Sequence, residues 1–576
     1  MSVIAPGESI RSVGAQRLLV WVACAVPLTA CLAIVVAKFL LVGRINISWD
    51  EFFYLSAVHE AARGELTLVL QGAYTHLFQW VTRLDADEVG QVVAARVPMA
   101  ALLAATALLL WRLASTWVTR TTALLAPLAY LSITAILQHG ASFRADSMLA
   151  PLCMLAAVLV RKSPGLRAAA LAGVCLGAAL AISIKAVLFA PVMLVLVALD
   201  TGTDGRVVLP RNVKTLAVVA GCAGVTAVAL ILLHKLSVVA ADTTMTAYAS
   251  RSFAKTIGDV PFFPRYTEYE WIKSQNLLAW LLLVAGAVCA IVRPRFRRAG
   301  ACGLSLLPLL FYRNAWPYYY VVMLAPACVL AAVAVENVRE LLQRLRWPAG
   351  PEVATLTFSV LLTIVAARHL SPLQADEQVA QREVVAAVHR IFPQAVPYID
   401  HSGMIGGFRK VNFFMSTWGV EDYRASGKSF VEPALAVHAP LLLANRPVLD
   451  PRSRSFEAEL LPRDRELIRQ FYQPYWGPIR VAGASTELVG RHPRRVELPF
   501  PGRYRVETET PIVIDDVVRR NGEVIDIEQP AVRMSAVSEP EPGAEPEVRV
   551  RLIWAAAQAP PSAAPPKQRL YEPIRN

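Results

Sequence analysis

The sequence lacks the short motifs by which many enzymes bind nucleotides or activate a nucleophile: it has no P-loop and no GxGxxG, GxSxG or HExxH pattern. Its polar C-terminal part has no cysteine, because all eight lie between Cys24 and Cys328, inside or at the ends of apolar runs. No disulfide framework or zinc-ligand spacing is therefore visible. His401, His438 and His492 likewise have no spacing that indicates a metal site. These absences argue against nucleotide-dependent, disulfide-stapled and zinc-dependent classes of protein.

Charged residues are few. They make up 18% of the 576 residues, whereas 55% are hydrophobic, and the mean hydropathy of +0.44 is unusually high for a soluble protein. The net charge is +13, but residues 371–576 hold 26 basic and 26 acidic residues, so the excess lies in residues 1–370. Basic residues in such an apolar segment mark cytoplasmic loops rather than a nucleic-acid surface. The composition indicates a polytopic membrane protein with no nucleic-acid partner.

Long apolar runs predict the membrane-spanning helices, since a helix of about 20 residues crosses the hydrocarbon core. The first run has no Ala-x-Ala cleavage pattern, so we interpret it as an uncleaved span rather than a signal peptide. The eleven predicted spans are 18–42, 92–111, 121–138, 147–160, 168–183, 186–199, 215–234, 276–292, 299–312, 318–335 and 353–370.

The loops between these spans predict the orientation of the chain. With the N-terminus in the cytoplasm, every cytoplasmic loop is basic, as the positive-inside rule expects. The residues concerned are Arg112, Arg120, Arg161, Lys162, Arg167, Arg206, Arg211, Lys214, Arg293, Arg295, Arg297, Arg298, Arg339, Arg344 and Arg346. The odd number of spans then places the loop after the first span, and the whole C-terminal part, on the outer face.

The C-terminal part divides into three stretches of different character. Residues 371–476 combine a helical spacing of apolar residues with short apolar strands, which predicts an extracytoplasmic α/β region. Residues 477–555 alternate polar and apolar residues between Pro, Gly and Asn-Gly, which predicts a β-sandwich-like module. Residues 556–576 are rich in Pro and Ala and are expected to be disordered. The expected fold is a mostly α polytopic membrane protein, residues 1–370, followed by this α/β and β-sandwich region.

An adjacent pair of acids, Asp50 and Glu51, follows the first span in the segment WDEFFYL. The aromatic residues around it, Tyr54 among them, are typical of a helix at a membrane surface. Adjacent helix positions point about 100° apart, so the two carboxylates cannot form one facing pair, although one could reach a cavity while the other orients its neighbours. The alternative is structural: Ser48 and Asp50 would begin a surface helix, whose first turn favours acids.

Ionisable residues also occur at membrane depth or at its outer edge. Arg144 and Asp146 lie in SFRADSML, Lys185 in ALAISIKAVLFAPV and Arg313 in FYRNAWPYYY. A charge inside a span costs at least about 2.5 kcal/mol on insertion scales, so it normally faces a cavity or a partner. Lys185 has no other charge near it in the sequence, whereas Arg144 and Asp146 could simply pair with each other.

Two further segments predicted on the outer side are candidates for binding. The aromatic run WPYYY at 316–320 forms either an interfacial belt or, beside Arg313, a groove for a lipid head, with Tyr319 as a candidate contact. The loop of residues 235–275, which contains Glu268, is long enough to fold over a site as a lid.

The order of these features resembles the GT-C superfamily of integral-membrane glycosyltransferases. The likeness is strongest to the branch that contains the protein O-mannosyltransferases and the bacterial lipid A aminoarabinose transferases. Members of that branch carry a DE pair and then a tyrosine in the first extracytoplasmic loop, as in WDEFFYL here. They also carry a lysine opening a span, as in ALAISIKAVLFAPV, and a basic residue before an aromatic, Pro-containing span, as in YRNAWPYYYVVMLAP. The chain departs from them in a longer polar loop before the second span and in a larger C-terminal module.

The resemblance implies transfer of a sugar, with inversion, from a polyprenyl-phosphate donor to an acceptor at the outer face of a bacterial inner membrane. It implies Asp50 as the catalytic base, with Glu51 in support. It also implies fixed cations that hold the departing lipid phosphate, for which Lys185, Arg313 and Arg144 are the candidates.

The remaining expectations concern contacts, partners and cofactors. Four residues are expected to contact the cavity or the acceptor: Tyr54, Asp146, Tyr319 and Glu268. The expected partners are a polyprenyl-phosphate-linked sugar, the lipid bilayer, and a lipid, glycan or protein acceptor. No metal site is predicted, and a divalent cation stays open as a cofactor because two adjacent carboxylates are too few ligands to argue for one.

Two other classes of protein stay open on the sequence alone. A transporter or flippase of a lipid-linked or anionic substrate would use the same charges, but no internal repeat is visible and a folded outer domain would have no role in it. A non-catalytic membrane anchor, whose β-module binds glycans or a partner protein, would leave Asp50, Lys185 and Arg313 without a role.

Overall fold

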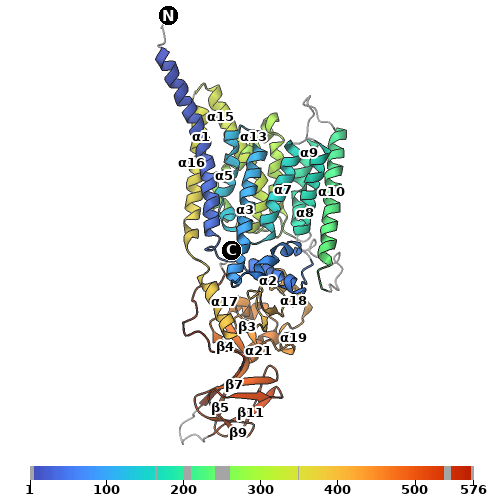
Figure 1. Ribbon diagram of the computed structural model, residues 1–576, viewed down its shortest axis with the longest axis vertical. Coiled ribbons are helices and arrows are strands. Elements are labelled where there is room, and N and C mark those ends of the chain that lie inside the picture. Colours follow the sequence, from blue (N-terminus) through green and yellow to red (C-terminus); the bar gives the residue numbers. More distant parts are fainter. Residues whose placement is uncertain are drawn as a thin grey trace.

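A computed structural model describes residues 6–69, 71–162, 165–199, 209–239, 260–347, 349–537 and 547–571. Along its long axis lie a bundle of helices, then a layer of short helices and strands, and then a β-module at the far end (Figure 1). Helix α1 begins at the end of the bundle that lies farthest from the β-module. The chain is mostly helical, and its described strands all fall within residues 397–554.

The bundle is built from α-helices joined by short 3₁₀ helices (η). The elements of its first half are α1 (Pro6–Leu41), α2 (Trp49–Arg63), η1 (Ala73–Arg83), α3 (Glu88–Ala114), α4 (Arg120–Ala123), α5 (Leu125–Ser132), α6 (Thr134–His139), α7 (Ala145–Lys162), α8 (Leu166–Ile182), η2 (Ile184–Phe189), α9 (Ala190–Ala198) and α10 (Leu209–Lys235). Those of its second half are α12 (Tyr266–Gln275), α13 (Leu277–Val292), η4 (Pro294–Phe296), η5 (Ala299–Leu310), η6 (Pro317–Tyr319), α14 (Tyr320–Ala327), α15 (Val329–Arg344) and α16 (Gly350–Leu370).

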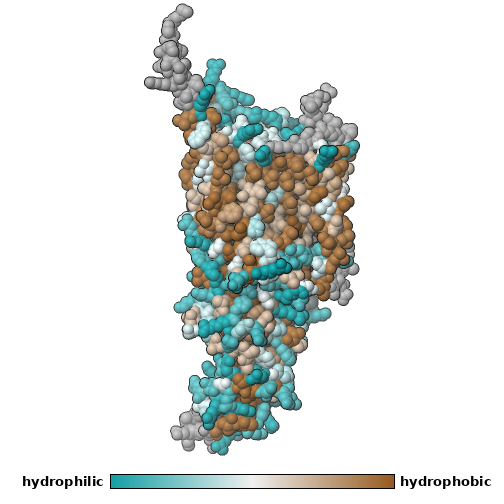
Figure 2. Space-filling view, viewed as in Figure 1, coloured by the Kyte–Doolittle hydropathy of each residue, from teal (hydrophilic) through white to brown (hydrophobic). Residues whose placement is uncertain are grey.

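Several of these helices are long and apolar enough to cross a membrane. Among the described residues there are four, within α1, α3, α10 and α16, or up to six if the bent pairs α12–α13 and α14–α15 each form one span. Apolar side chains cover the bundle in a broad belt, whereas the C-terminal domain is mainly hydrophilic (Figure 2). The chain is therefore a multi-pass membrane protein. The count of eleven spans stays a prediction, because the other predicted spans coincide with shorter or broken helices.

The predicted span at 121–138 is broken in the middle. Helix α5 ends at Ser132, and Ile133 has an extended backbone, with φ −78° and ψ 132°. The freed N–H of Thr134 donates to Asn276 Oδ1 at 3.1 Å, and Asn276 is itself the residue that separates α12 from α13. Irregular backbone at membrane depth is tolerated only where other protein groups satisfy it, and these two breaks meet that condition together.

Basic residues predicted to be cytoplasmic are joined by polar contacts across the bundle. Arg339 donates to the hydroxyls of Thr119 and Thr122 at 2.9 and 2.6 Å, and Arg293 pairs with Glu340 at 2.8 Å. Loops that are far apart in the sequence therefore meet at one end of the bundle. The distribution of basic residues predicts that these loops lie on the same side of the membrane.

Helices α8 and α10 approach closely because α8 presents two glycines to α10. A Cβ atom on Gly173 would lie 2.5 Å from the carbonyl oxygen of Val219, and one on Gly177 would lie 2.5 Å from that of Ala223. Small residues four positions apart let helix backbones approach in membranes, where dispersion contacts drive the association of helices. Helix α8 leads directly into η2, so this packing also supports the position of Lys185.

The C-terminal domain carries two sheets with short helices on one of them. Its helices are η7 (Pro372–Gln374), α17 (Val379–Ile391), α18 (Thr417–Ser426), α19 (Val431–Ala436), η8 (Pro447–Leu449), α20 (Arg454–Glu459) and α21 (Pro462–Phe471). Its strands are β1 (Pro397–Ile399), β2 (Arg409–Lys410), β3 (Leu441–Leu443), β4 (Tyr472–Trp476), β5 (Ile479–Val489), β6 (Arg494–Glu497), β7 (Gly502–Thr508), β8 (Ile512–Ile514), β9 (Val517–Arg519), β10 (Val524–Ile527), β11 (Ala531–Ala536) and β12 (Glu547–Trp554). One sheet has the order β10-β7-β12-β5-β3-β1-β2, with β4 also paired to β5, and the other has the order β6-β11-β8-β9.

Strand β5 joins the two regions that the sequence separates at residue 477. Its first residues pair with β3 and β4, and its later residues pair with β12 of the β-module. Separate hydrophobic cores lie along it, one that includes Leu442 and one that includes Tyr504. The α/β region and the β-module therefore share a continuous strand instead of a linker.

The tail of residues 556–576, expected to be disordered, follows a defined path as far as Tyr571. Tyr571 is only 4% exposed. The carbonyl oxygen of the preceding Leu570 accepts hydrogen bonds from Asn46 at 3.2 Å and from Gln381 at 2.7 Å. The order of residues 556–571 comes from partners in both parts of the molecule, which composition does not reveal, and residues 572–576 lie outside the described residues.

Polar contacts fix the C-terminal domain to the bundle. Gln381 of α17 exchanges hydrogen bonds of 3.1 and 2.7 Å with the backbone of Ile47. Glu88, at the start of α3, accepts from His389 at 2.8 Å and from the N–H of Gly407 at 3.2 Å. These contacts set the position of the domain relative to the bundle, and hence the shape of the space between them.

The glycine contact between α8 and α10 predicts a sharp response to one methyl group. We expect Gly173→Ala to lower the stability by about 1–3 kcal/mol, because backbone atoms of α10 would have to move. Thermal unfolding of the purified protein in detergent measures this. Gly221→Ala is the matched control, since a Cβ on Gly221 of α10 meets nothing within 4 Å; equal melting temperatures for the two variants would contradict the packing argument.

Candidate active site

A cavity of about 1730 Å³ lies between the bundle and the C-terminal domain. From the bundle it is lined by residues of α2, η2 and the segments before α7, α12 and α14, including Asp50, Tyr54, Arg144, Lys185, Arg265 and Tyr318. From the domain it is lined by His401, Arg446 and the tail residue Tyr571, among others. Polar and aromatic groups from distant parts of the chain thus share one concave surface, which is typical of a binding or catalytic site.

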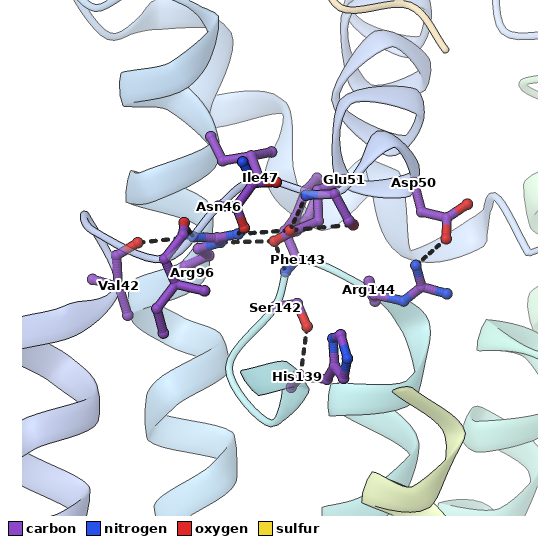
Figure 3. Close-up of polar contacts among 12 residues, drawn as sticks. Val42, Asn46, Ile47, Asp50, Glu51, Arg96, His139, Ser142, Phe143 and Arg144 are labelled. Carbon is purple, nitrogen blue, oxygen red and sulfur yellow. Dashed lines mark hydrogen bonds and ion pairs between the residues drawn. The ribbon is translucent and has the colours of Figure 1, made fainter. Parts of the chain in front are cut away.

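Helix α2 places the two adjacent acids in different environments. Ser48 precedes the helix as its N-cap, and Asp50 and Glu51 lie in the first turn, as the structural alternative predicts. The Asp50 side chain is 19% exposed and lines the cavity, whereas that of Glu51 is 1% exposed and does not. Figure 3 shows the two carboxylates pointing to different partners. The adjacent acids therefore have separate roles.

Glu51 is the partner of Arg96, a buried arginine of α3. The guanidinium donates to both carboxylate oxygens at 2.7 Å. Its other N–H groups donate to the carbonyl oxygens of Val42, Ile45 and Asn46, at 2.7 to 2.9 Å, so all five donors are used (Figure 3). The arginine thereby joins α3, the turn after α1 and the start of α2.

Glu51 also accepts two backbone hydrogen bonds. The N–H of Phe143 donates at 2.7 Å and that of Ser48 at 3.0 Å. Burial acts to raise the pKa of Glu51, but Arg96 and these hydrogen bonds together hold the pKa below its ordinary value. Glu51 is therefore a buried carboxylate that holds the Phe143 segment, and the adjacent Arg144, against α2.

Arg144 lies between the carboxylates of Asp50 and Asp146. Its Nη1 group donates to Asp50 Oδ2 (Figure 3), and its Nε lies 3.6 Å from Asp146 Oδ2. The guanidinium carbon stands 3.5 Å from the centre of the Tyr318 ring. The pairing of Arg144 with Asp146, left open by the sequence, is present but weaker than the contact with Asp50.

Lys185 is the second cation of this group. Its ammonium lies 3.0 Å from Asp146 Oδ1 and 5.1 Å from the centre of the Tyr318 ring. Asp146 itself is 2% exposed and does not line the cavity. One buried carboxylate thus holds two cations, Lys185 and Arg144, whose side chains both line the cavity.

Besides Glu51 and Asp146, three more residues expected at the site lie outside the cavity lining. Tyr319 is buried, and its hydroxyl donates to the carbonyl oxygen of Lys185 at 3.4 Å. Arg313 pairs at 2.7 Å with Glu421 of α18. Glu268 is buried, 3.7 Å from Arg265. Tyr319 thus supports the backbone of Lys185, and Arg313 joins the bundle to the domain. None of the three residues lines the cavity.

Arg265 takes the place in the cavity that the sequence predicts for Arg313. Its Nε donates to the carbonyl oxygen of Arg313 at 2.9 Å, and its guanidinium carbon lies 3.5 Å from the Trp316 ring centre. The predicted lid, residues 235–275, falls partly on residues 240–259, which lie outside the described residues. Arg265 belongs to the described part of that loop. The loop stands out in the sequence by its length, but nothing in the sequence selects Arg265 within it.

The domain-side wall was not predicted from the sequence. Trp49 lies between His401, with ring centres 5.5 Å apart, and Arg446, whose guanidinium carbon is 4.2 Å from the indole centre. The hydroxyl of Tyr571 accepts from Asn445 at 3.3 Å. Only the histidine stood out in the sequence, as a lone residue without a metal partner. Within the described ranges no group of three or more His, Cys, Asp and Glu residues could hold a metal ion.

Comparisons with known proteins give matches in structure only. No protein-family model matches the sequence, and no curated protein matches it. ArnT from Cupriavidus metallidurans bound to undecaprenyl phosphate is 15% identical with a TM-score of 0.48, covering 72% of this chain and 88% of that one. Arabinosyltransferase EmbB from Mycobacterium smegmatis is 13% identical with a TM-score of 0.41, covering 92% and 63%.

A third similar structure is the S. cerevisiae protein O-mannosyltransferase Pmt1-Pmt2 complex bound to the sugar donor. It is 14% identical with a TM-score of 0.30, covering 37% of this chain and 34% of that one. All three TM-scores are below 0.5, so these likenesses do not assign a function to the cavity.

The burial of Glu51 predicts that removing its carboxylate lowers the stability of the protein. We expect Glu51→Ala to lower the stability by about 3–5 kcal/mol, because Arg96 would remain buried without its counter-ion. Glu65→Ala removes an exposed carboxylate, 2.9 Å from Arg63, and should cost no more than about 1 kcal/mol. Thermal unfolding in detergent compares the two. A Glu51→Ala protein as stable as the Glu65→Ala protein would show that the buried pair is dispensable.

Proposed function

We propose that the chain is a GT-C-type membrane glycosyltransferase that moves a sugar from a polyprenyl-phosphate donor to an acceptor, with inversion. One observation carries the proposal: Asp50, Arg144 and Lys185, from three separate segments, line one cavity where the bundle meets the C-terminal domain. A lipid-linked donor needs such a place, because its chain stays in the bilayer while its sugar phosphate reaches a polar site. The proposed setting is a bacterial inner membrane, with the N-terminus in the cytoplasm and the C-terminal domain outside.

Asp50 is the proposed base. The acceptor hydroxyl gives its proton to Asp50, and its oxygen forms a bond to the anomeric carbon of the donor sugar. The bond from that carbon to the phosphate oxygen breaks, and its electron pair leaves with the lipid phosphate. A single displacement of this kind inverts the anomeric configuration. The partial exposure of Asp50 on the cavity, compared with the burial of Glu51, is the reason to assign the base to Asp50.

Lys185 and Arg144 are the proposed partners of the departing phosphate. Both are cations on the cavity surface, and the buried Asp146 holds them close to each other. Fixed charges aimed at the place where negative charge develops lower the barrier without reorganising during the reaction. Glu51 is then a positioning residue, since it holds Phe143 and hence the segment that carries Arg144.

Arg144 links the donor to the base. It pairs with Asp50, so a phosphate that binds Arg144 competes with Asp50 for the same guanidinium. The four charges of Asp50, Arg144, Asp146 and Lys185 cancel, and a phosphate that takes over Arg144 leaves the Asp50 carboxylate free to accept a proton. Donor binding would therefore precede activation of the acceptor.

Removal of the proposed base gives the first functional test. We expect Asp50→Asn to reduce transfer from a radiolabelled polyprenyl-phosphate sugar by about 10²–10⁴-fold in purified membranes. The variant should fold normally, because Arg144 keeps Asp146 as a counter-ion. Asp85→Asn changes an exposed carboxylate outside the cavity and is the control. Parental transfer by a folded Asp50→Asn protein would exclude Asp50 as the base.

Removal of a donor-side cation gives the second test. We expect Lys185→Ala to lose transfer by about 10²-fold or more, because the leaving phosphate loses a fixed positive charge. Lys235→Ala, which changes an exposed lysine at the end of α10, should leave transfer at the parental level. Movement of the lipid-linked sugar across the membrane of proteoliposomes, with no transfer in any variant, would instead indicate a transporter.

A further inference from the structure

Arg446 is a half-buried arginine of the domain-side wall that makes no ion pair with a carboxylate of the described residues. It lies between β3 and η8, half-buried, with its guanidinium over the Trp49 ring. Its neighbours on the wall have partners: Arg452 contacts Asp450 at 3.2 Å, and Arg480 donates to the carbonyl oxygen of Tyr472 at 2.7 Å. No ion pair joins Arg446 to any carboxylate among the described residues. Burial lowers the pKa of Arg446, which is the expected effect of removing a cation from water without a counter-ion.

His401 is a second buried polar group on this wall. It is 4% exposed, and its Nδ1 atom has no hydrogen-bond partner in the described structure. Burial, with Arg446 and Lys410 nearby, holds the pKa of His401 well below its ordinary value, so the ring is neutral and can bond a hydroxyl. The residue lines the cavity, and a buried polar atom without a partner is costly unless a ligand or water satisfies it.

The fold fixes the place of both groups. The N–H of His401 donates to Asn445 Oδ1 at 3.2 Å, and its carbonyl oxygen accepts from the N–H of Met415 at 3.0 Å. The Asn445 side chain also donates to Tyr571 and to Asp400, which holds the loop that leads into Arg446. The backbone positions of His401 and Arg446 are therefore preorganised, as those of binding groups are expected to be.

The position of Trp49 decides which substrate these groups meet. Trp49 contacts both His401 and Arg446, and it directly precedes Asp50 in α2. A sugar held against Trp49 thus lies next to the proposed base, where the hydroxyl nucleophile must be. The donor phosphate is retained on the bundle side by its lipid chain, near Lys185, whereas His401 and Arg446 belong to the domain outside the membrane.

We propose that Trp49, His401 and Arg446 form an acceptor subsite, and that this subsite takes a sugar that carries a phosphate or carboxylate group. The inference rests on the proposed function, because it assigns the acceptor side of the same cavity. The guanidinium of Arg446 binds the anionic group through two parallel N–H groups, as arginine does with phosphates and carboxylates. His401 bonds a ring hydroxyl, and Trp49 holds both the guanidinium and the sugar beside Asp50.

The test is equilibrium binding without donor, by calorimetry on the full-length protein in detergent. The probes are glucose 6-phosphate, glucuronic acid and glucose. We expect both anionic sugars to bind at least tenfold more tightly than glucose, and Arg446→Gln to weaken them by about tenfold or more. Arg446→Lys keeps the charge but not the fork and should lose less. Arg409→Gln, at an exposed arginine outside the cavity, should bind like the parent, and Lys185→Ala reports any binding of the anion on the donor side.

Three results would overturn the subsite. The first is binding of glucose as tight as that of the two anionic sugars, and the second is no binding of any probe to the parent. The third is loss of anion binding in Lys185→Ala but not in Arg446→Gln, which would place the anion on the donor side. Because no donor is present, failure of this subsite is separate from failure of Asp50 as the base, which only the transfer assay reports.

Discussion

The bidentate ion pair between Arg96 and Glu51 is the interaction on which the site depends. The pair is buried. The guanidinium of Arg96 uses two donors on Glu51 and its other three on backbone carbonyl oxygens, and Glu51 also accepts from Phe143. Together these bonds join α3, the turn after α1, the start of α2 and the segment before α7. Taking two charges out of water is unfavourable unless each is fully satisfied, and here each is. The pair does no chemistry in the proposed reaction. It sets the direction in which α2 presents Asp50 and the distance at which Arg144 meets it.

Seen as a charge distribution, the cavity has two unlike sides. On the bundle side the cations Arg144, Lys185 and Arg265 each lie within 4 Å of a carboxylate, that of Asp50, Asp146 or Glu268. On the domain side Arg446 makes no ion pair with a carboxylate of the described residues. A site that joins two anionic molecules needs a cation for each of them. In the proposed reaction, the bundle-side cations bind the donor phosphate and Arg446 binds the anionic group of the acceptor.

Local patterns predicted the parts of the site that depend on local chemistry. The cap at Ser48, the acids of the first turn and the isolated Lys185 were all visible, because helix starts and charges at membrane depth leave signals within a few residues. The identities of Arg265, Arg446 and Tyr571 as cavity residues were not visible. Each reaches the cavity only because segments hundreds of residues apart pack together, and no spacing in one sequence records such contacts. Arg313 shows the converse: its setting resembled a phosphate site, but Glu421 of the domain pairs with it.

The fold was predictable to a similar depth. Apolar runs marked helices correctly, but breaks such as Ile133 depend on a partner side chain, Asn276, that lies far along the chain. Alternation of polar and apolar residues marked the strands of the β-module, while β5 continued into the preceding region because its first half pairs with β3 and β4.

The C-terminal residues Leu570 and Tyr571 contribute to the wall of the cavity and to the junction between the bundle and the domain. Tyr571 seals the wall beside Trp49, and Leu570 bridges the turn after α1 to α17. These residues are synthesised after every helix of the bundle has been made. A chain truncated before Leu570 would keep every helix of the bundle but would lack the part of the cavity wall that Tyr571 forms. The shape of the cavity thus depends on residues that the membrane part does not contain.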